Sequence, residues 1–202
     1  MTDQFEITPA TDGQTGANPP TKWMWYLFYI HIGNLVLSCI LPIWPTNPVT
    51  PWIGSALYAC MAVCLFRLTP ACSRYRKAAI FTGISLILTL LVKIPLLPNL
   101  LTMAASVLAI ISSYQELYAH AEVVESQDAA LSRKWRNLFI WELVIGVISG
   151  FFSVAAVTIM VLADMELEQI VSLITGAMAL VALIPSILHI LYLRKTIRLF
   201  ES

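Results

Sequence analysis

Charged side chains are scarce in this chain of 202 residues: Asp, Glu, Lys and Arg make up 12% of it, while 58% of the residues are hydrophobic. Soluble domains are about a quarter charged, so the sequence lacks the polar coat that a water-exposed surface needs. The formal net charge is zero, which leaves no bulk electrostatic attraction to nucleic acid. We therefore expect an integral membrane protein whose main partner is the lipid bilayer, and no nucleic-acid binding.

Motifs for catalysis and cofactor binding are also missing. The sequence has no H-E-x-x-H zinc motif, no G-x-S-x-G nucleophile elbow, no Walker A lysine and no dinucleotide fingerprint. The four cysteines have no zinc-binding spacing, and three of them lie in apolar stretches, where free buried thiols are usual; they are Cys39, Cys60, Cys64 and Cys72. We expect no enzymatic activity and no cofactor.

The first 21 residues lack an apolar periodicity and are rich in Thr, Gly and Pro. Such a segment cannot bury enough surface to offset its chain entropy, so residues 1–21 are expected to form a disordered cytoplasmic tail. They also lack the basic region and cleavage site of a signal peptide. Residues 22–202 are therefore expected to form a single transmembrane domain.

Six long apolar stretches follow the tail, at residues 23–44, 52–69, 78–94, 99–120, 138–163 and 170–193. A helix needs about 20 apolar residues to cross about 30 Å of hydrocarbon, and in lipid each spanning segment must satisfy its own backbone. Two prolines in KIPLLPN (93–99) separate the third stretch from the fourth. The sequence predicts an all-α, polytopic integral membrane protein, a bundle of six transmembrane helices.

Basic residues predict the orientation of this bundle. If the N-terminus is cytoplasmic, all of the 12 Lys and Arg residues except Lys93 lie on the inner side. The outer connections are uncharged or, at residues 164–169, acidic. Cations in short loops resist translocation, so we expect both termini in the cytoplasm, in a plasma membrane or a bacterial inner membrane. The proline-rich segment 41–52 then lies outside, as a stiff connection.

Few ionisable side chains lie inside the expected spans, where they are costly and by default candidates for function. They are His31, Glu116, His120, Glu142 and His189, with Asn34 and Tyr114 as lesser polar candidates. From a rise of about 1.5 Å per residue, all five ionisable groups lie in the cytoplasmic half. A shared layer of carboxylates and imidazoles suits a divalent metal or a proton relay. Alternatively, the groups turn outward to the headgroups.

Small residues at a spacing of four mark the fifth span. Gly146 and Gly150 form a G-x-x-x-G motif, and Ser153 extends the small surface. Such a face lets two helices approach closely, so it predicts either packing within one copy or contact with a second copy or another membrane protein. Just before this span, Asp128 is a candidate helix N-cap, and Trp135 is expected at headgroup level.

Two functions fit these features, and an intramembrane enzyme is disfavoured because no nucleophile and base are paired. The sequence favours a non-enzymatic accessory or assembly component of a membrane complex. The alternative is a small carrier or channel for a cation, metal or proton that uses the polar layer, with the metal unspecified.

Overall fold

A computed structural model of the chain describes residues 21–40, 49–91, 98–162 and 168–201. Side chains are described over the same ranges except at 98–99 and 153–179. Within these residues the chain forms six α-helices and no strand, which confirms the all-α expectation. The expected tail, apart from Thr21, lies outside the described residues, as does most of the proline-rich segment.

The helices follow the six apolar stretches of the sequence. They are α1 (Thr21–Ile40), α2 (Thr50–Arg67), α3 (Ser73–Leu91), α4 (Pro98–Val124), α5 (Ala129–Leu162) and α6 (Glu168–Glu201). Pro51 lies in the first turn of α2 and Pro98 opens α4, positions where a missing backbone N–H costs nothing. Asp128 caps α5 as expected, because its Oδ1 accepts a hydrogen bond from the Leu131 N–H at 2.8 Å.

Four segments among the described residues are long and apolar enough to cross a membrane. They are Thr21–Ile40, Leu100–Val124, Ala129–Phe152 and Leu180–Glu201. The two remaining helices carry more polar ends: α2 has 18 residues and ends on Arg67, and α3 begins with Arg74, Arg76 and Lys77 in its first turns. Four apolar helices of this length indicate a membrane protein.

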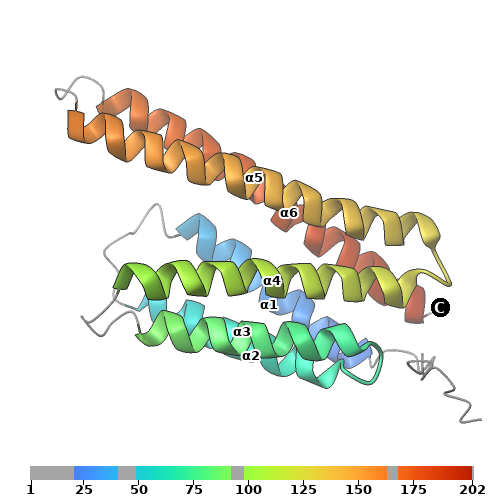
Figure 1. Cartoon of the computed structure of the whole chain (residues 1–202). Coiled ribbons are helices and arrows are strands. Elements are labelled where there is room, and N and C mark those ends of the chain that lie inside the picture. Colours follow the sequence, from blue (N-terminus) through green and yellow to red (C-terminus); the bar gives the residue numbers. More distant parts are fainter. Residues whose placement is uncertain (1–20, 41–48, 92–97, 163–167, 202) are drawn as a thin grey trace, which may run out of the picture.

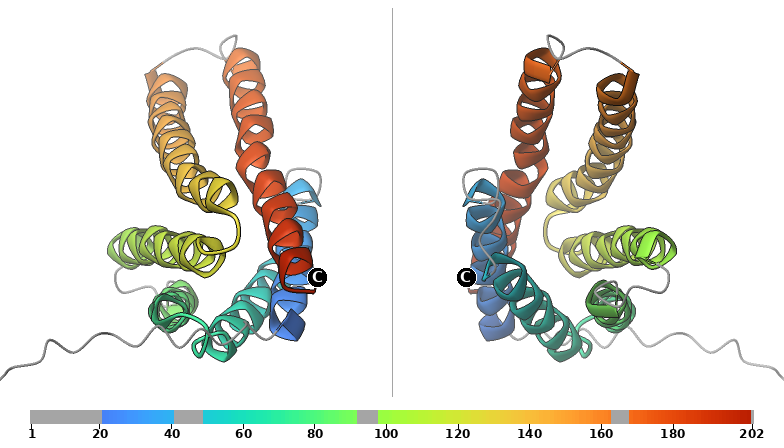
Figure 2. Two further views of the ribbon diagram at one scale, coloured as in Figure 1. Left: turned by 90° about the vertical axis from the view of Figure 1, so that its right-hand side faces the viewer. Right: turned by 90° about the vertical axis from the view of Figure 1, so that its left-hand side faces the viewer.

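The six helices form a ring in chain order. Each helix packs against the next, and α6 packs against α1 to close the ring (Figure 2). The helices run roughly lengthwise and alternate in direction (Figure 1). The connections 68–72 and 125–128 and the C-terminus therefore lie together at one end of the bundle, which we call the charged end.

Ion pairs join neighbouring segments at the charged end. They link Arg74 to Glu122, Arg136 to Glu125 (2.9 Å) and Lys195 to Asp128 (2.7 Å). The Trp25 indole N–H also donates to Glu201 at 2.7 Å, which joins α1 to α6. Ion pairs near a solvated surface add little net stability, so these contacts fix register more than they provide stability.

Tightly packed side chains concentrate in the same half of the bundle. The fully buried ones include Met24, Leu27, Leu65, Leu68, Tyr75, Leu117, Leu131, Trp135, Leu138, Leu193 and Ile197. Toward the other end, apolar side chains such as Leu100 and Met103 point outward, 65% and 69% exposed. The core therefore lies near the charged end, and the opposite half of the ring is more open.

Replacing Asp128 tests how the charged end contributes to stability. Its pKa is lowered chiefly by the Lys195 hydrogen bond and also by the Leu131 N–H. Asp128→Asn should keep the cap but lose the ion pair, and Asp128→Ala should lose both. Thermal unfolding in detergent should therefore rank wild type above Asn and Asn above Ala, by a few degrees at each step.

The pH dependence of that difference has a definite sign. A carboxylate with a lowered pKa stabilises the folded state above its unfolded pKa, and this contribution disappears as pH falls through the folded pKa. The gap between wild type and Asp128→Asn should stay constant from pH 8 to pH 5 and shrink only below about pH 4. A gap that vanishes at neutral pH would contradict a role for the ion pair.

Candidate functional site

A cavity of about 560 Å³ lies inside the ring, and all six helices line it. Its walls carry small and hydroxyl-bearing residues, among them Ser38, Gly54, Ser85, Ser112 and Ser186, and the amide of Asn34. Among the described residues, the lining contains neither Lys nor Arg. Its ionisable residues are His31, Glu116, Glu142 and His189, which come from α1, α4, α5 and α6.

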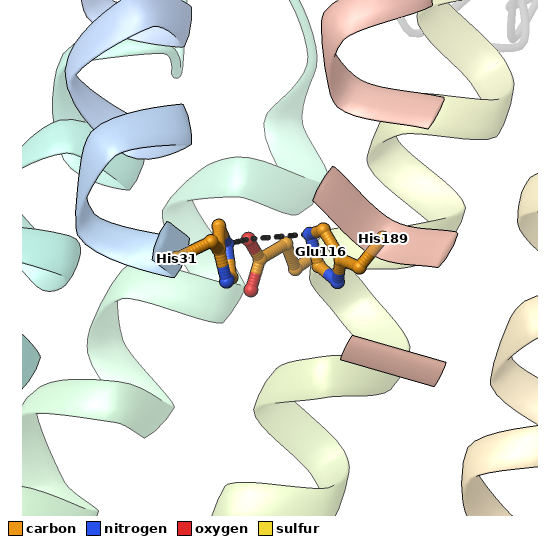
Figure 3. Close-up of side chains that lie close together, drawn as sticks. All are labelled: His31, Glu116 and His189. Atoms are coloured by element: carbon orange, nitrogen blue, oxygen red, sulfur yellow. Dashed lines mark hydrogen bonds and ion pairs between the residues drawn. The ribbon is translucent and has the colours of Figure 1, made fainter. Parts of the chain in front are cut away.

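Glu116 is the centre of the ionisable cluster and is 3% exposed. Its Oε1 atom lies 3.0 Å from His31 Nε2, within hydrogen-bond distance. The Nε2 atoms of His189 and His120 lie 3.8 and 3.9 Å from the same oxygen. Figure 3 shows the Glu116 carboxylate between the His31 and His189 rings. Three imidazoles from three helices therefore surround one buried carboxylate.

Glu142 adds a second carboxylate on the cavity side of His189. Its Oε1 lies 3.8 Å from His189 Nδ1, and its Oε2 accepts a hydrogen bond from Ser113 Oγ at 2.6 Å. The side chain is 26% exposed, far more than Glu116. Glu142 is thus positioned where a group in the cavity can reach it, whereas Glu116 lies deeper in the packed helices.

A buried aromatic layer separates the cluster from the charged end. Tyr75 OH lies 2.7 Å from His120 Nδ1, and the Trp135 ring stacks on His120 with 4.6 Å between centroids. Trp135 also meets His189 edge-on at 5.2 Å. We call Tyr75 and Trp135, which cover His120, the aromatic wall; both side chains are fully buried.

Trp135 faces the inside of the bundle. It was expected at headgroup level; the structure shows that it is fully buried and that its indole N–H donates to Thr196 Oγ1 at 3.1 Å. Tryptophan prefers an interface because its N–H needs a polar partner beside an apolar ring. Here α6 supplies that partner, so the ring does not face the headgroups, and its depth in the membrane stays a prediction.

Two buried nitrogens of the cluster lack a hydrogen-bond partner among the described residues: His120 Nε2 and His189 Nε2. Buried polar atoms are nearly always paired, so an unpaired one needs an explanation. Both nitrogens face Glu116 Oε1 from a distance too long for a hydrogen bond. The lone pairs of these nitrogens and of the Glu116 oxygen can bind a proton or coordinate a cation between them.

The structure brings together all five ionisable residues expected from the sequence: His31, Glu116, His120, Glu142 and His189. Outward turning, the alternative, does not occur at Glu116, His120 or His189, which are buried. That the cluster binds an ion stays a prediction.

One of the two lesser candidates lies at the cavity, and two residues that contact the cluster were not expected from the sequence. Asn34 lines the cavity, whereas Tyr114 packs against Tyr118 and Phe139 and lies outside the lining. Tyr75 was missed because α3 begins at Ser73 and not at the expected residue 78, so this residue lay before the expected span. Ser113 was also missed, although it precedes Glu116 by three residues and so lies on nearly the same helix face.

The glycine face of α5 is open among the described residues. No atom of another described segment lies within 4 Å of a Cβ built on Gly146 or Gly150. Packing within one copy stays a prediction, because the side chains at 153–179 lie outside the described residues. The Ser153 side chain is outside the described residues. Contact with a second copy or another protein stays a prediction.

No protein-family model, curated protein or solved structure matches this chain. The functional assignment consequently depends on the cavity and the cluster.

Trp135 should contribute strongly to stability because it fills the space between His120 and His189. Trp135→Ala leaves a cavity there, and we expect a loss of about 3 to 5 kcal/mol in the free energy of unfolding, measured by denaturation in detergent. Trp141→Ala is the matched control on the same helix, because Trp141 is 60% exposed. Equal losses for the two variants would contradict the buried role of Trp135.

Proposed function

We propose that the protein is a six-span membrane carrier for a small cation, which is held at Glu116 inside the central cavity. The observation that carries this proposal is a buried carboxylate approached by three imidazole nitrogens beside a cavity lined by all six helices. An ionised carboxylate in a low-dielectric interior needs a compensating positive charge, and the described part of the lining offers neither Lys nor Arg. A bound cation or proton supplies that charge.

Exposed apolar side chains on the two shorter helices support six spans. On α2 these are Trp52, Ile53, Val63 and Phe66, and on α3 they are Ile80, Ile84, Ile87 and Leu91. With 18 and 19 residues, α2 and α3 are about 27 and 28 Å long, close to the thickness of the hydrocarbon layer. Both helices complete a ring whose other members are long apolar helices.

The proposed orientation puts the charged end in the cytoplasm, because it carries the cationic segments. The cavity lining reaches Ser38 near the end of α1 and Thr50 at the start of α2, both remote from the charged end. The cavity would then face the outside, with the aromatic wall between the cluster and the cytoplasm. Transport requires a second state in which the wall opens and the outer half closes around the fixed site.

An accessory or assembly role is the second candidate, and the open glycine face favours it. Val147 and Phe151 beside this face are 64% and 73% exposed, so a second helix can approach Gly146 and Gly150 closely. A carrier ranks first because a partner on this outer face cannot contact the buried cluster, which would then have no role.

Glu116→Gln should abolish cation flux while leaving the shape of the side chain unchanged. Purified protein in liposomes is assayed with two probes: protons, read by a trapped pH-sensitive dye, and Co²⁺, read by a trapped chelating dye. Wild type should carry at least one probe above the rate of protein-free liposomes, and Glu116→Gln should fall to that rate. Glu125→Gln is the matched control, because Glu125 is exposed and pairs with Arg136.

A glycine-face variant separates the two candidates. Gly146→Leu combined with Gly150→Leu should leave flux unchanged if the protein is a carrier. Flux that is absent in wild type, or unaffected by Glu116→Gln, would contradict the carrier. A homodimer that dissociates in the glycine variant, combined with absent flux, would favour the assembly role.

Cysteine labelling tests the orientation and the cavity together. In a variant whose four native cysteines are replaced, Ser38→Cys should react with a membrane-impermeant maleimide added outside intact cells. Glu125→Cys at the charged end should react only after the cells are permeabilised. The reverse pattern would contradict the orientation, and an unreactive Ser38→Cys in permeabilised cells would contradict the open cavity.

A further inference from the structure

We propose that the cluster is a site for a divalent transition-metal ion, with His31 Nε2, Glu116 Oε1 and His189 Nε2 as ligands and His120 Nε2 as the fourth. This inference names the substrate class of the carrier and so rests on the proposed function. All three histidines of the chain take part. Two of them present the unpaired, buried nitrogens described above.

The separations of the ligand atoms fit one metal ion. The nitrogens of His31 and His189 and the Glu116 oxygen all lie within 4.8 Å of one another (Figure 3). Around an ion with bonds of about 2.0 to 2.1 Å, tetrahedral ligands lie about 3.4 Å apart, so each atom needs to move less than about 1 Å. His120 Nε2 lies 3.9 Å from the same oxygen but is not in the group of atoms within 4.8 Å of one another, and the His120 and His189 ring centroids are 6.0 Å apart, so the His120 ring has to shift further than the other ligands to become the fourth.

The same distances argue against a proton relay as the main role. A relay passes protons along hydrogen bonds, which need about 2.7 to 3.2 Å between nitrogen and oxygen. The His31 contact at 3.0 Å meets this requirement, whereas the His189 and His120 contacts at 3.8 and 3.9 Å would have to shorten by about 0.6 Å or more. Without that movement, these separations are closer to the distance of about 3.4 Å between two ligands of one ion, so the metal site ranks first.

Donor chemistry narrows the class of metal. Imidazole with carboxylate suits Zn²⁺, Mn²⁺, Fe²⁺, Co²⁺ and Ni²⁺, whereas Mg²⁺ and Ca²⁺ prefer all-oxygen sites and Cu⁺ prefers sulfur. Among the described residues, no cysteine lines the cavity. The carboxylates of Glu116 and Glu142 supply two negative charges near the site, which a divalent ion neutralises.

One neighbouring group already orients a ligand as a metal site requires. Histidine ligands are usually oriented through their other ring nitrogen. Tyr75 OH lies 2.7 Å from His120 Nδ1, whereas Glu142 Oε1, at 3.8 Å from His189 Nδ1, has to move closer before it can hold that ring by a hydrogen bond. The His31 and His189 rings are 4.0 Å apart, a distance at which two imidazolium ions would repel each other and two neutral ligands would not.

Co²⁺ binding to the purified full-length protein in detergent tests the site. The protein carries an affinity tag without histidine, and the visible absorption of Co²⁺ reports its ligand geometry. Wild type should bind one Co²⁺ per chain with the strong bands of a tetrahedral site, and a large excess of Mg²⁺ or Ca²⁺ should not displace it. Absence of binding, or displacement by Mg²⁺, would overturn the inference.

Variants assign the ligands. Glu116→Gln and His189→Gln should weaken Co²⁺ binding by more than about 100-fold, and Tyr75→Phe by about 10- to 100-fold. Glu125→Gln should bind as wild type does. Undiminished binding in Glu116→Gln would overturn the assignment. If a variant fails to fold, X-ray absorption of the wild-type Zn²⁺ complex decides, because an environment without imidazole scattering overturns the site.

The outcomes for metal binding and for transport are distinguishable. Proton flux that depends on Glu116, without Co²⁺ binding, would overturn the metal site and leave the carrier. Specific Co²⁺ binding without flux of either probe would leave the metal site and overturn the carrier.

Discussion

The carboxylate of Glu116 lies among apolar helices with three imidazoles around it, and this interaction determines how the ring must close. Burying an unpaired carboxylate costs several kcal/mol even after relaxation, so the charge must be compensated locally. His31 on α1 and His189 on α6 supply this environment only if the first and last helices meet beside α4. The packing of α1 against α6, with these two rings 4.0 Å apart, provides that closure.

The bundle is dense on one side of the cluster and hollow on the other. Between the cluster and the charged end, the aromatic wall and large aliphatic side chains fill the ring. On the other side, hydroxyl-bearing and small residues surround open space. Hydroxyl groups in the wall donate hydrogen bonds to backbone carbonyls of neighbouring helices. Ser85 Oγ donates to the Ala105 carbonyl at 2.9 Å, and Ser112 Oγ donates to the Ala78 carbonyl at 3.0 Å. A polar cavity can therefore exist without unpaired hydroxyls at these positions.

Much of the helical layout follows from sequence, because proline placement and apolar length act locally. Every member of the cluster could also be identified from the sequence, because ionisable residues inside apolar stretches are few. Their convergence was beyond prediction, since it depends on which helices are neighbours and how each is rotated. Trp135 shows why side-chain burial was not predictable from local sequence. Its sequence neighbours are cationic, but Thr196, 61 residues away, supplies its hydrogen-bond acceptor inside the fold. Gly146 shows the same limit of local sequence, because a packing motif does not specify its partner.

A purely structural origin for the cluster is hard to reconcile with its energetics. Apolar side chains of similar volume at buried polar positions are often neutral or stabilising, so packing alone does not require Glu116, His120 or His189. Two of the three imidazoles leave a buried nitrogen unpaired, which lowers stability further. An arrangement that is unfavourable when empty becomes favourable when a cation pairs with every one of these atoms. The binding free energy then offsets the cost of building the site.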